Sequence, residues 1–179
     1  MITLIIPYLE CDADKPAVLK RCLDSLVNEY DELIIIDEKI DNLATKINLG
    51  LSRAKGDYLV VSNDDIVLSS GHLKDLCIPG TVTTPLVNNG LPMGKKFHGH
   101  MWCLPREVYE KVGGMYEGYD GFYYDDTDYE QMILKAGIPI ETVESVDIYH
   151  PVGGRTLHSF PDWQEKYANN EQIYKERWG

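Results

Sequence analysis

The sequence has no apolar run that approaches the roughly 20 residues needed to cross a membrane. No basic region precedes the short apolar run at its N-terminus, so the start does not read as a secretory signal. No repeat, low-complexity tract or linker interrupts the chain. We therefore expect no integral membrane segment and a single domain over residues 1–179.

Basic residues are scarce: 17 Lys and Arg stand against 29 Asp and Glu, which gives a net charge of −12. Such a surface repels nucleic-acid backbone and anionic lipid, so nucleic acid is not expected as a partner. Cysteines are few and show no C-x-x-C or zinc spacing, which favours a reduced, cytoplasmic location. The four are Cys11, Cys22, Cys77 and Cys103.

The first 68 residues alternate between strand and helix patterns. Short apolar, β-branched runs predict strands at 2–6, 33–36 and 58–61. A helical period of apolar residues predicts helices at 16–30 and 43–54. This alternation predicts an α/β fold with a mostly parallel central sheet flanked by helices.

The second half is less regular. A final helix is expected to pack by its aromatic face, which includes Trp163, Tyr167 and Trp178. The tyrosines before residue 125 could form a platform for a sugar or could close the core. We expect helices at 70–76, 105–112 and 126–136, strands at 81–87, 97–104 and 140–149, and loops at 88–96 and 115–124.

Polar side chains follow two of the predicted strands. Asn63, Asp64 and Asp65 come directly after the third strand, and Asp37 follows the second. The carboxyl ends of parallel strands meet at the edge where open α/β sheets bind ligands. Carboxylate oxygens there can hold a hard divalent cation, and the cation can hold phosphate. The alternative for these residues is a polar turn.

The segment NLGLSRAKGDYLVVSNDD at residues 48–65 resembles the family-two glycosyltransferases of the GT-A fold. Three later segments are similar to family motifs and come in the family's order: VGGMYE at 112–117, YDDTDY at 124–129 and HPVGGRT at 150–156. The resemblance implies one Rossmann-like GT-A domain. Residues 1–68 would form its nucleotide-binding half, and residues 69–179 its acceptor and catalytic half.

The same resemblance implies a Mn²⁺ or Mg²⁺ site and a nucleotide-sugar site. Asp65 would be the direct metal ligand, with His150 and Asn63 beside it, although a lone histidine is more often structural. Asp64 would meet the ribose, and Asp37 the nucleobase. The other residues implied for the donor site are Pro7, Tyr8 and Asn48.

Asp126 is the residue that the resemblance implies as the general base, with Asp125 where the family has glutamate. A carboxylate at a helix start also favours the helix dipole, so a structural role is the alternative. Asp128 is expected to cap or support, and His98 and His100 to be structural. The implied function is metal-dependent, inverting transfer of a sugar from a nucleotide-diphosphate donor to a glycan, lipid or protein acceptor. A nucleotidyltransferase and a non-catalytic sugar-nucleotide-binding protein are the alternatives.

Overall fold

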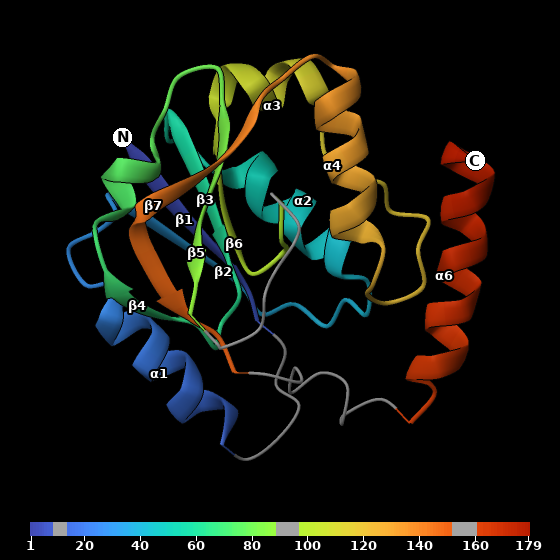
Figure 1. The fold of residues 1–179 in the computed structure, drawn as a ribbon. Helices are drawn as coiled ribbons and strands as arrows, with labels where there is room; N and C mark the ends of the chain where they lie inside the picture. Colours follow the sequence, from blue (N-terminus) through green and yellow to red (C-terminus); the bar gives the residue numbers. More distant parts are fainter. Residues whose placement is uncertain (9–13, 89–96, 152–160) are drawn as a thin grey trace.

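The strands of the protein lie in one sheet, with helices on both faces (Figure 1). The computed structural model describes residues 1–8, 14–88, 97–151 and 161–179. The strand order is β2-β1-β3-β6-β5-β7-β4. The strands are β1 (Ile2–Pro7), β2 (Glu32–Ile36), β3 (Tyr58–Ser62), β4 (Val67–Ser70), β5 (Val82–Val87), β6 (Met101–Pro105) and β7 (Ile140–Tyr149). The helices are α1 (Lys15–Ser25), α2 (Leu43–Arg53), the short 3-10 helix η1 (Leu73–Leu76), α3 (Arg106–Val112), α4 (Asp125–Lys135) and α6 (Trp163–Trp178).

The direction of the strands decides which residues meet at each edge of the sheet. β1 pairs in parallel with β2 and β3, and β5 pairs in parallel with β7. β6 is antiparallel to both β3 and β5, and β4 is antiparallel to β7. Five strands therefore run one way, and β4 and β6 run the other way. The predicted α/β fold is confirmed, with a sheet that is mixed.

Two apolar clusters fill the space between the sheet and its helices. Successive residues of β1 point to opposite faces, so Ile5 joins one cluster and Leu4 joins the other. Helices α2, α3 and α4 contribute to the cluster of Ile5, whereas α1 and η1 contribute to the cluster of Leu4. Cys22 of α1 is fully buried, as its place on an apolar helix face predicts. Helix α6 lies on the outside of α4, at the right of Figure 1.

Most predicted elements of the second half are present: β7 has the predicted ends, the final helix α6 is present, and β5, β6, α3 and α4 have shifted ends. Helix α3 ends at Gly113, whose φ of 83° favours glycine. The helix predicted at 70–76 is only the 3-10 turn η1, because residues 67–70 pair with β7 as the unpredicted strand β4. Of the predicted loop at 88–96, only Asn88 belongs to the described residues. No helix in the described part of the chain is both long and apolar enough to span a membrane.

Candidate active site

The three predicted metal residues meet at one edge of the sheet. Asn63 and Asp65 follow the end of β3, and His150 follows the end of β7, which runs in the same direction. His150 Nε2 lies 3.2 Å from Asp65 Oδ1 and 3.3 Å from Asn63 Nδ2. Asp65 and His150 are each only 6% exposed. Residues 152–156, which complete the late motif, lie outside the described residues.

The charges at this edge keep Asp65 ionised. Burial by itself raises the pKa of Asp65, but the hydrogen bond and charge of His150, with the charge of Lys15, hold this pKa below its ordinary value. A carboxylate oxygen, an imidazole nitrogen and an amide oxygen are suitable ligands for Mn²⁺ or Mg²⁺. A half-turn of the Asn63 amide would direct its oxygen to the site.

The donor set is small. In the ranges that the structure describes, no group of three His, Cys, Asp or Glu side chains could hold a metal ion. Asp65 and His150 would therefore act together with the amide of Asn63. Mg²⁺ commonly takes one or two carboxylates and fills its other positions with water and substrate phosphate. The residues present fit a metal that is shared with a phosphate-bearing ligand.

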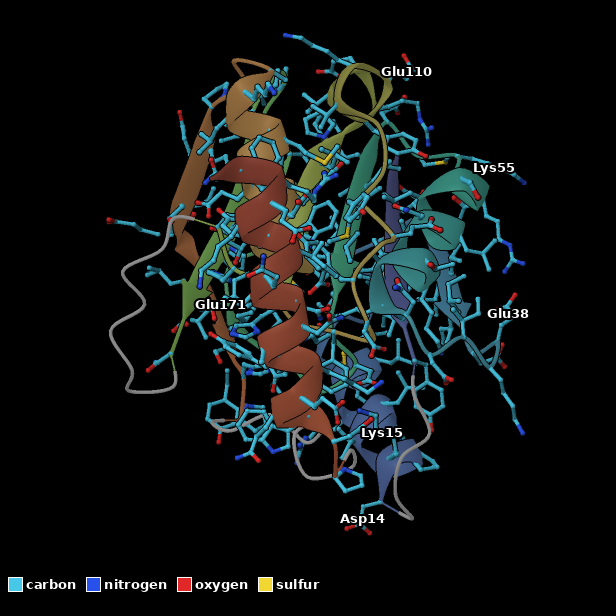
Figure 2. All side chains as sticks on the ribbon, turned by 90° about the vertical axis from the view of Figure 1, so that its right-hand side faces the viewer. Asp14, Lys15, Glu38, Lys55, Glu110 and Glu171 are labelled. Carbon is cyan, nitrogen blue, oxygen red and sulfur yellow. The ribbon has the colours of Figure 1, made fainter. Side chains whose placement is uncertain are left out.

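Lys15 is a buried cation that sequence reasoning did not single out. Its Nζ lies 2.6 Å from Asp64 Oδ1, and the two side chains are 5% and 7% exposed. In Figure 2, Lys15 lies inside the molecule near the start of α1, whereas Asp14 lies at its rim. Lysine at a helix start is ordinarily exposed, so no sequence pattern marks this one. The ammonium offsets part of the negative charge of the adjacent Asp64 and Asp65.

Three predicted donor residues lie along the same edge, at the ends of β1 and β2. Pro7 is the buried last residue of β1, and Tyr8 follows it. The amide of Tyr8 donates to the Ile36 carbonyl at 2.9 Å, and its own carbonyl accepts from Lys46 Nζ at 2.6 Å. Asp37 follows β2 and is exposed. The Asp37 carboxylate is therefore accessible to a ligand from solvent.

Asn48 lies apart from the other predicted donor residues. From α2, its Nδ2 donates to the Met115 carbonyl at 2.8 Å and to Glu117 Oε1 at 2.6 Å. Its Oδ1 accepts from the Met115 amide at 2.7 Å. These hydrogen bonds hold the segment after α3 against α2. A direct contact of Asn48 with the donor stays a prediction.

The segment before β6 connects the edge that holds the predicted metal residues with α4. Because β6 is antiparallel to β3, the start of β6 lies beside the end of β3. The backbone amide of Asn63 donates to the His100 carbonyl at 2.8 Å. The ring of His100 stacks on that of His150, with centroids 3.9 Å apart and planes at 14°. Next to it, Gly99 packs against Asp126 at the start of α4.

The two adjacent aspartates at the start of α4 differ in access. Asp125 is buried, and burial together with the nearby charge of Asp126 raises the pKa of Asp125 to about 7. Asp126 is half-buried, and its Oδ1 accepts from the Thr127 amide at 2.7 Å. Tyr123 and Tyr124, just before them, have φ of 77° and 67°. Left-handed residues of this kind cost roughly 1–2 kcal/mol each and cluster at functional sites.

Asp128 has the supporting role that the sequence predicted. It is fully buried and accepts from Tyr119 Oη at 2.8 Å, Arg177 Nε at 2.6 Å and Trp178 Nε1 at 2.7 Å. These bonds tie the last turn of α6 to the first turns of α4. Aromatic contacts add to them, since the Tyr167 ring lies 5.2 Å from that of Tyr124 and 5.5 Å from that of Tyr123. Helix α6 therefore packs by its aromatic face, as predicted, and the surface that it packs on includes the loop before α4.

Comparison with known proteins gives no family model and no curated protein that matches the chain. Solved structures do match it. A mutant of β1,4-galactosyltransferase 7 from Drosophila, in complex with manganese, UDP-Gal and xylobiose, has a TM-score of 0.67 at 14% identity, over 92% of this chain and 78% of that chain. GalNAc-T7 with UDP, GalNAc and Mn²⁺ has a TM-score of 0.74 at 12% identity, over 90% of this chain and 45% of that one. The chain has the GT-A fold.

A further match to this GT-A domain is the mannosyltransferase PcManGT from Pyrobaculum calidifontis, in complex with GDP-Man and Mn²⁺. Its TM-score is 0.65 at 17% identity, over 95% of this chain and 61% of that chain. At such identities the likeness is one of fold, and the activity has to be argued from the site. In this GT-A domain, the candidate site is an acidic edge with a histidine and a buried lysine, and the half-buried Asp126 lies next to residue 99.

Proposed function

We propose that the protein is a metal-dependent glycosyltransferase that moves a sugar from a nucleotide-diphosphate donor to an acceptor hydroxyl. The observation that carries this proposal is the placement of Asp65 and His150, 3.2 Å apart, at the edge to which residues 98–100 also bring Asp126. The GT-A fold adds support, because similar structures hold UDP-Gal, UDP or GDP-Man together with manganese.

The donor would lie along the carboxyl edge of the sheet. Asp65, His150 and Asn63 would hold Mn²⁺ or Mg²⁺, which when bound would offset the charge that develops on the departing diphosphate. Lys15 holds Asp64 in place to meet the ribose. The nucleobase would lie against the ends of β1 and β2, where the other donor residues are. These are Pro7, Tyr8 and Asp37, while Asn48 holds the segment after α3 against α2.

The acceptor would approach from the side of α4. In a single displacement, the acceptor oxygen forms a bond to the anomeric carbon while the bond to the diphosphate breaks, which inverts the configuration. The hydroxyl proton passes to the carboxylate of Asp126, because this side chain is half-buried whereas Asp125 is buried. A saccharide is one acceptor class to test, since a similar structure holds xylobiose.

Turnover of sugar nucleotides tests the proposal. The protein is incubated with UDP-, GDP- and ADP-sugars and neutral disaccharides, with Mn²⁺, Mg²⁺ or EDTA, and products are identified by mass spectrometry. We expect release of nucleoside diphosphate and a glycosylated product only with metal. Asp65→Ala should remove the response to metal and lower turnover at least about a hundredfold.

The matched control is His72→Ala, which removes an exposed histidine that pairs with Glu29 and should leave turnover unchanged. Release of pyrophosphate instead of nucleoside diphosphate would indicate nucleotidyl transfer. Metal-dependent binding of a sugar nucleotide without any turnover would indicate a non-catalytic binding protein. Either outcome contradicts the proposal.

A further inference from the structure

Residues 98–100 form a short segment between the two halves of the proposed site. One end of this segment is fixed through the His100 carbonyl, which accepts from the backbone amide of Asn63 at 2.8 Å. The other end is fixed through His98, whose Nε2 lies 3.0 Å from the Pro85 carbonyl. A backbone amide just after β3 and a backbone carbonyl within β5 thereby hold a segment that has no regular structure of its own.

The anchor at His98 has a defined chemistry. His98 is 4% exposed, and this burial lowers its pKa below the ordinary value, so the ring is neutral near pH 7. A carbonyl oxygen can only accept, so the ring proton lies on Nε2 and is donated to Pro85. The hydrogen bond from this buried, neutral imidazole to the Pro85 carbonyl therefore fixes the segment to β5.

Gly99 occupies the middle of the segment for reasons of space. Its φ lies outside the left-handed region, so the backbone alone would admit any residue. A Cβ on Gly99 would lie 3.1 Å from Asp126 Cβ and 3.4 Å from Asp126 Oδ2. Contacts this short require the neighbour to move by a few tenths of an ångström.

Asp126 lies on a main chain that has little freedom to move away from position 99. Its Oδ1 accepts from the Thr127 amide at 2.7 Å, which fixes the rotation of the carboxylate. Its main chain follows Tyr123 and Tyr124, whose left-handed backbone leaves few alternative paths. Since the main chain is fixed, a side chain at position 99 would displace the Asp126 side chain by a few tenths of an ångström and strain its hydrogen bond to the Thr127 amide.

We infer that Gly99 is a positioning residue for Asp126: the missing side chain determines where the carboxylate lies, and His98 holds Gly99 at that place. The inference rests on the proposed function, in which Asp126 takes the acceptor proton. It also explains the presence of glycine at a position where the backbone does not need it. Residues 98–100 then fix the distance between the proposed metal-binding edge and Asp126.

The kinetic test uses Gly99→Ala in the full chain. We expect kcat for transfer to fall about tenfold, because a displacement of 1 Å costs on the order of a hundredfold and the expected displacement is smaller. The KM for the donor and the metal requirement should stay within about twofold. His98→Ala should also lower kcat, and His98→Gln should restore part of it, because the glutamine amide can donate near the position of Nε2.

Gly80→Ala is the matched control. Gly80 has a φ of 67°, and a Cβ there would meet no atom within 4 Å. The substitution is therefore expected to lower stability by roughly 1–2 kcal/mol without touching Asp126. Unchanged kcat in Gly80→Ala shows that a general loss of stability is not the cause of the effect at position 99.

A second readout does not depend on activity. The Thr127 amide resonance reports its hydrogen bond to Asp126, so we expect it to shift in Gly99→Ala and to stay in place in Gly80→Ala. If the parent protein transfers no sugar, the proposed function fails, and this resonance still decides the inference on Gly99. If Gly99→Ala does not fold, the two His98 variants decide it by the same resonance and the same kinetics. Unchanged kcat and an unchanged Thr127 resonance overturn the inference.

Discussion

Replacing Asp128 with alanine would leave four hydrogen-bond donors without their acceptor. Tyr119 Oη, Arg177 Nε, Arg177 Nη2 and Trp178 Nε1 all donate to this carboxylate, at 2.6–3.2 Å. Asp128 is fully buried, while the Arg177 side chain remains 29% exposed. The substitution therefore leaves these donors without an acceptor at a fully buried position, although the partly exposed Arg177 can bind water instead.

The cost follows from this burial. Removing one partner of a buried ion pair costs about 3–5 kcal/mol, and partial hydration of Arg177 places Asp128→Ala near about 3 kcal/mol. Native domains are stable by only about 5–15 kcal/mol, so a large part of the stability is at stake. Asp128→Asn should also be costly, because one amide position would present hydrogens to Arg177 or Trp178.

Urea unfolding followed by circular dichroism measures this loss as a shift of the midpoint at constant slope. The control is Asp24→Ala, which removes an exposed carboxylate paired with Lys20 and should change the free energy of unfolding by less than about 1 kcal/mol. The double variant Asp128→Ala/Arg177→Ala should be less destabilised than the sum of the single variants. If Asp128→Ala loses no more than Asp24→Ala, this reasoning about the buried carboxylate is wrong.

Two further predictions concern the start of α4. Asp126→Asn keeps an oxygen to accept from the Thr127 amide, so we expect the free energy of unfolding to change by less than about 1 kcal/mol. Transfer by the same variant should fall at least about a hundredfold, and full activity in a folded Asp126→Asn protein would exclude Asp126 as the base. The second prediction is a pH dependence. Since the pKa of Asp125 rises from about 4 in the unfolded chain to about 7 in the native state, the native state binds more protons between these values. The contribution of Asp125 to the free energy of unfolding therefore falls as the pH rises through this window. Urea titrations at several pH values should show a smaller fall for Asp125→Asn, and an identical fall would contradict a raised pKa.

The first half of the chain could be predicted well because its signals are local. Apolar β-branched runs identified β1, β2 and β3, and the rule for parallel strands placed Asp37 and Asp65 at one edge. Strand β4 was missed because it has only four residues, two of them exposed serines, so its pairing with β7 leaves no pattern in the sequence. The direction of β6 could not be predicted either, because an apolar run gives the same strand signal whether the strand pairs in parallel or antiparallel.

The parts of the site that were missed depend on long-range contacts. Lys15 lies 49 residues from Asp64, and Arg177 lies 49 residues from Asp128, so no periodicity connects the members of either pair. His98 and His100 were expected to be structural, and their contacts agree with this. Their importance for the site comes from the antiparallel course of β6, which brings residues 98–100 to the edge where β3 ends. Conversely, the motif residue Asn48 makes its contacts with a loop rather than with the edge.

The attachment of α6 has a consequence for a chain that is cut between β7 and α6. A cut between β7 and α6 would leave Asn63, Asp65 and His150, the proposed metal ligands, in one piece, but it would separate α6 from the helix that carries Asp126. Asn170 accepts from the Asp120 amide and donates to the Phe122 carbonyl, and Arg177 and Trp178 bind Asp128. The cut chain would therefore keep the proposed metal-binding residues together and lose the contacts that hold Asp128 and the loop before α4.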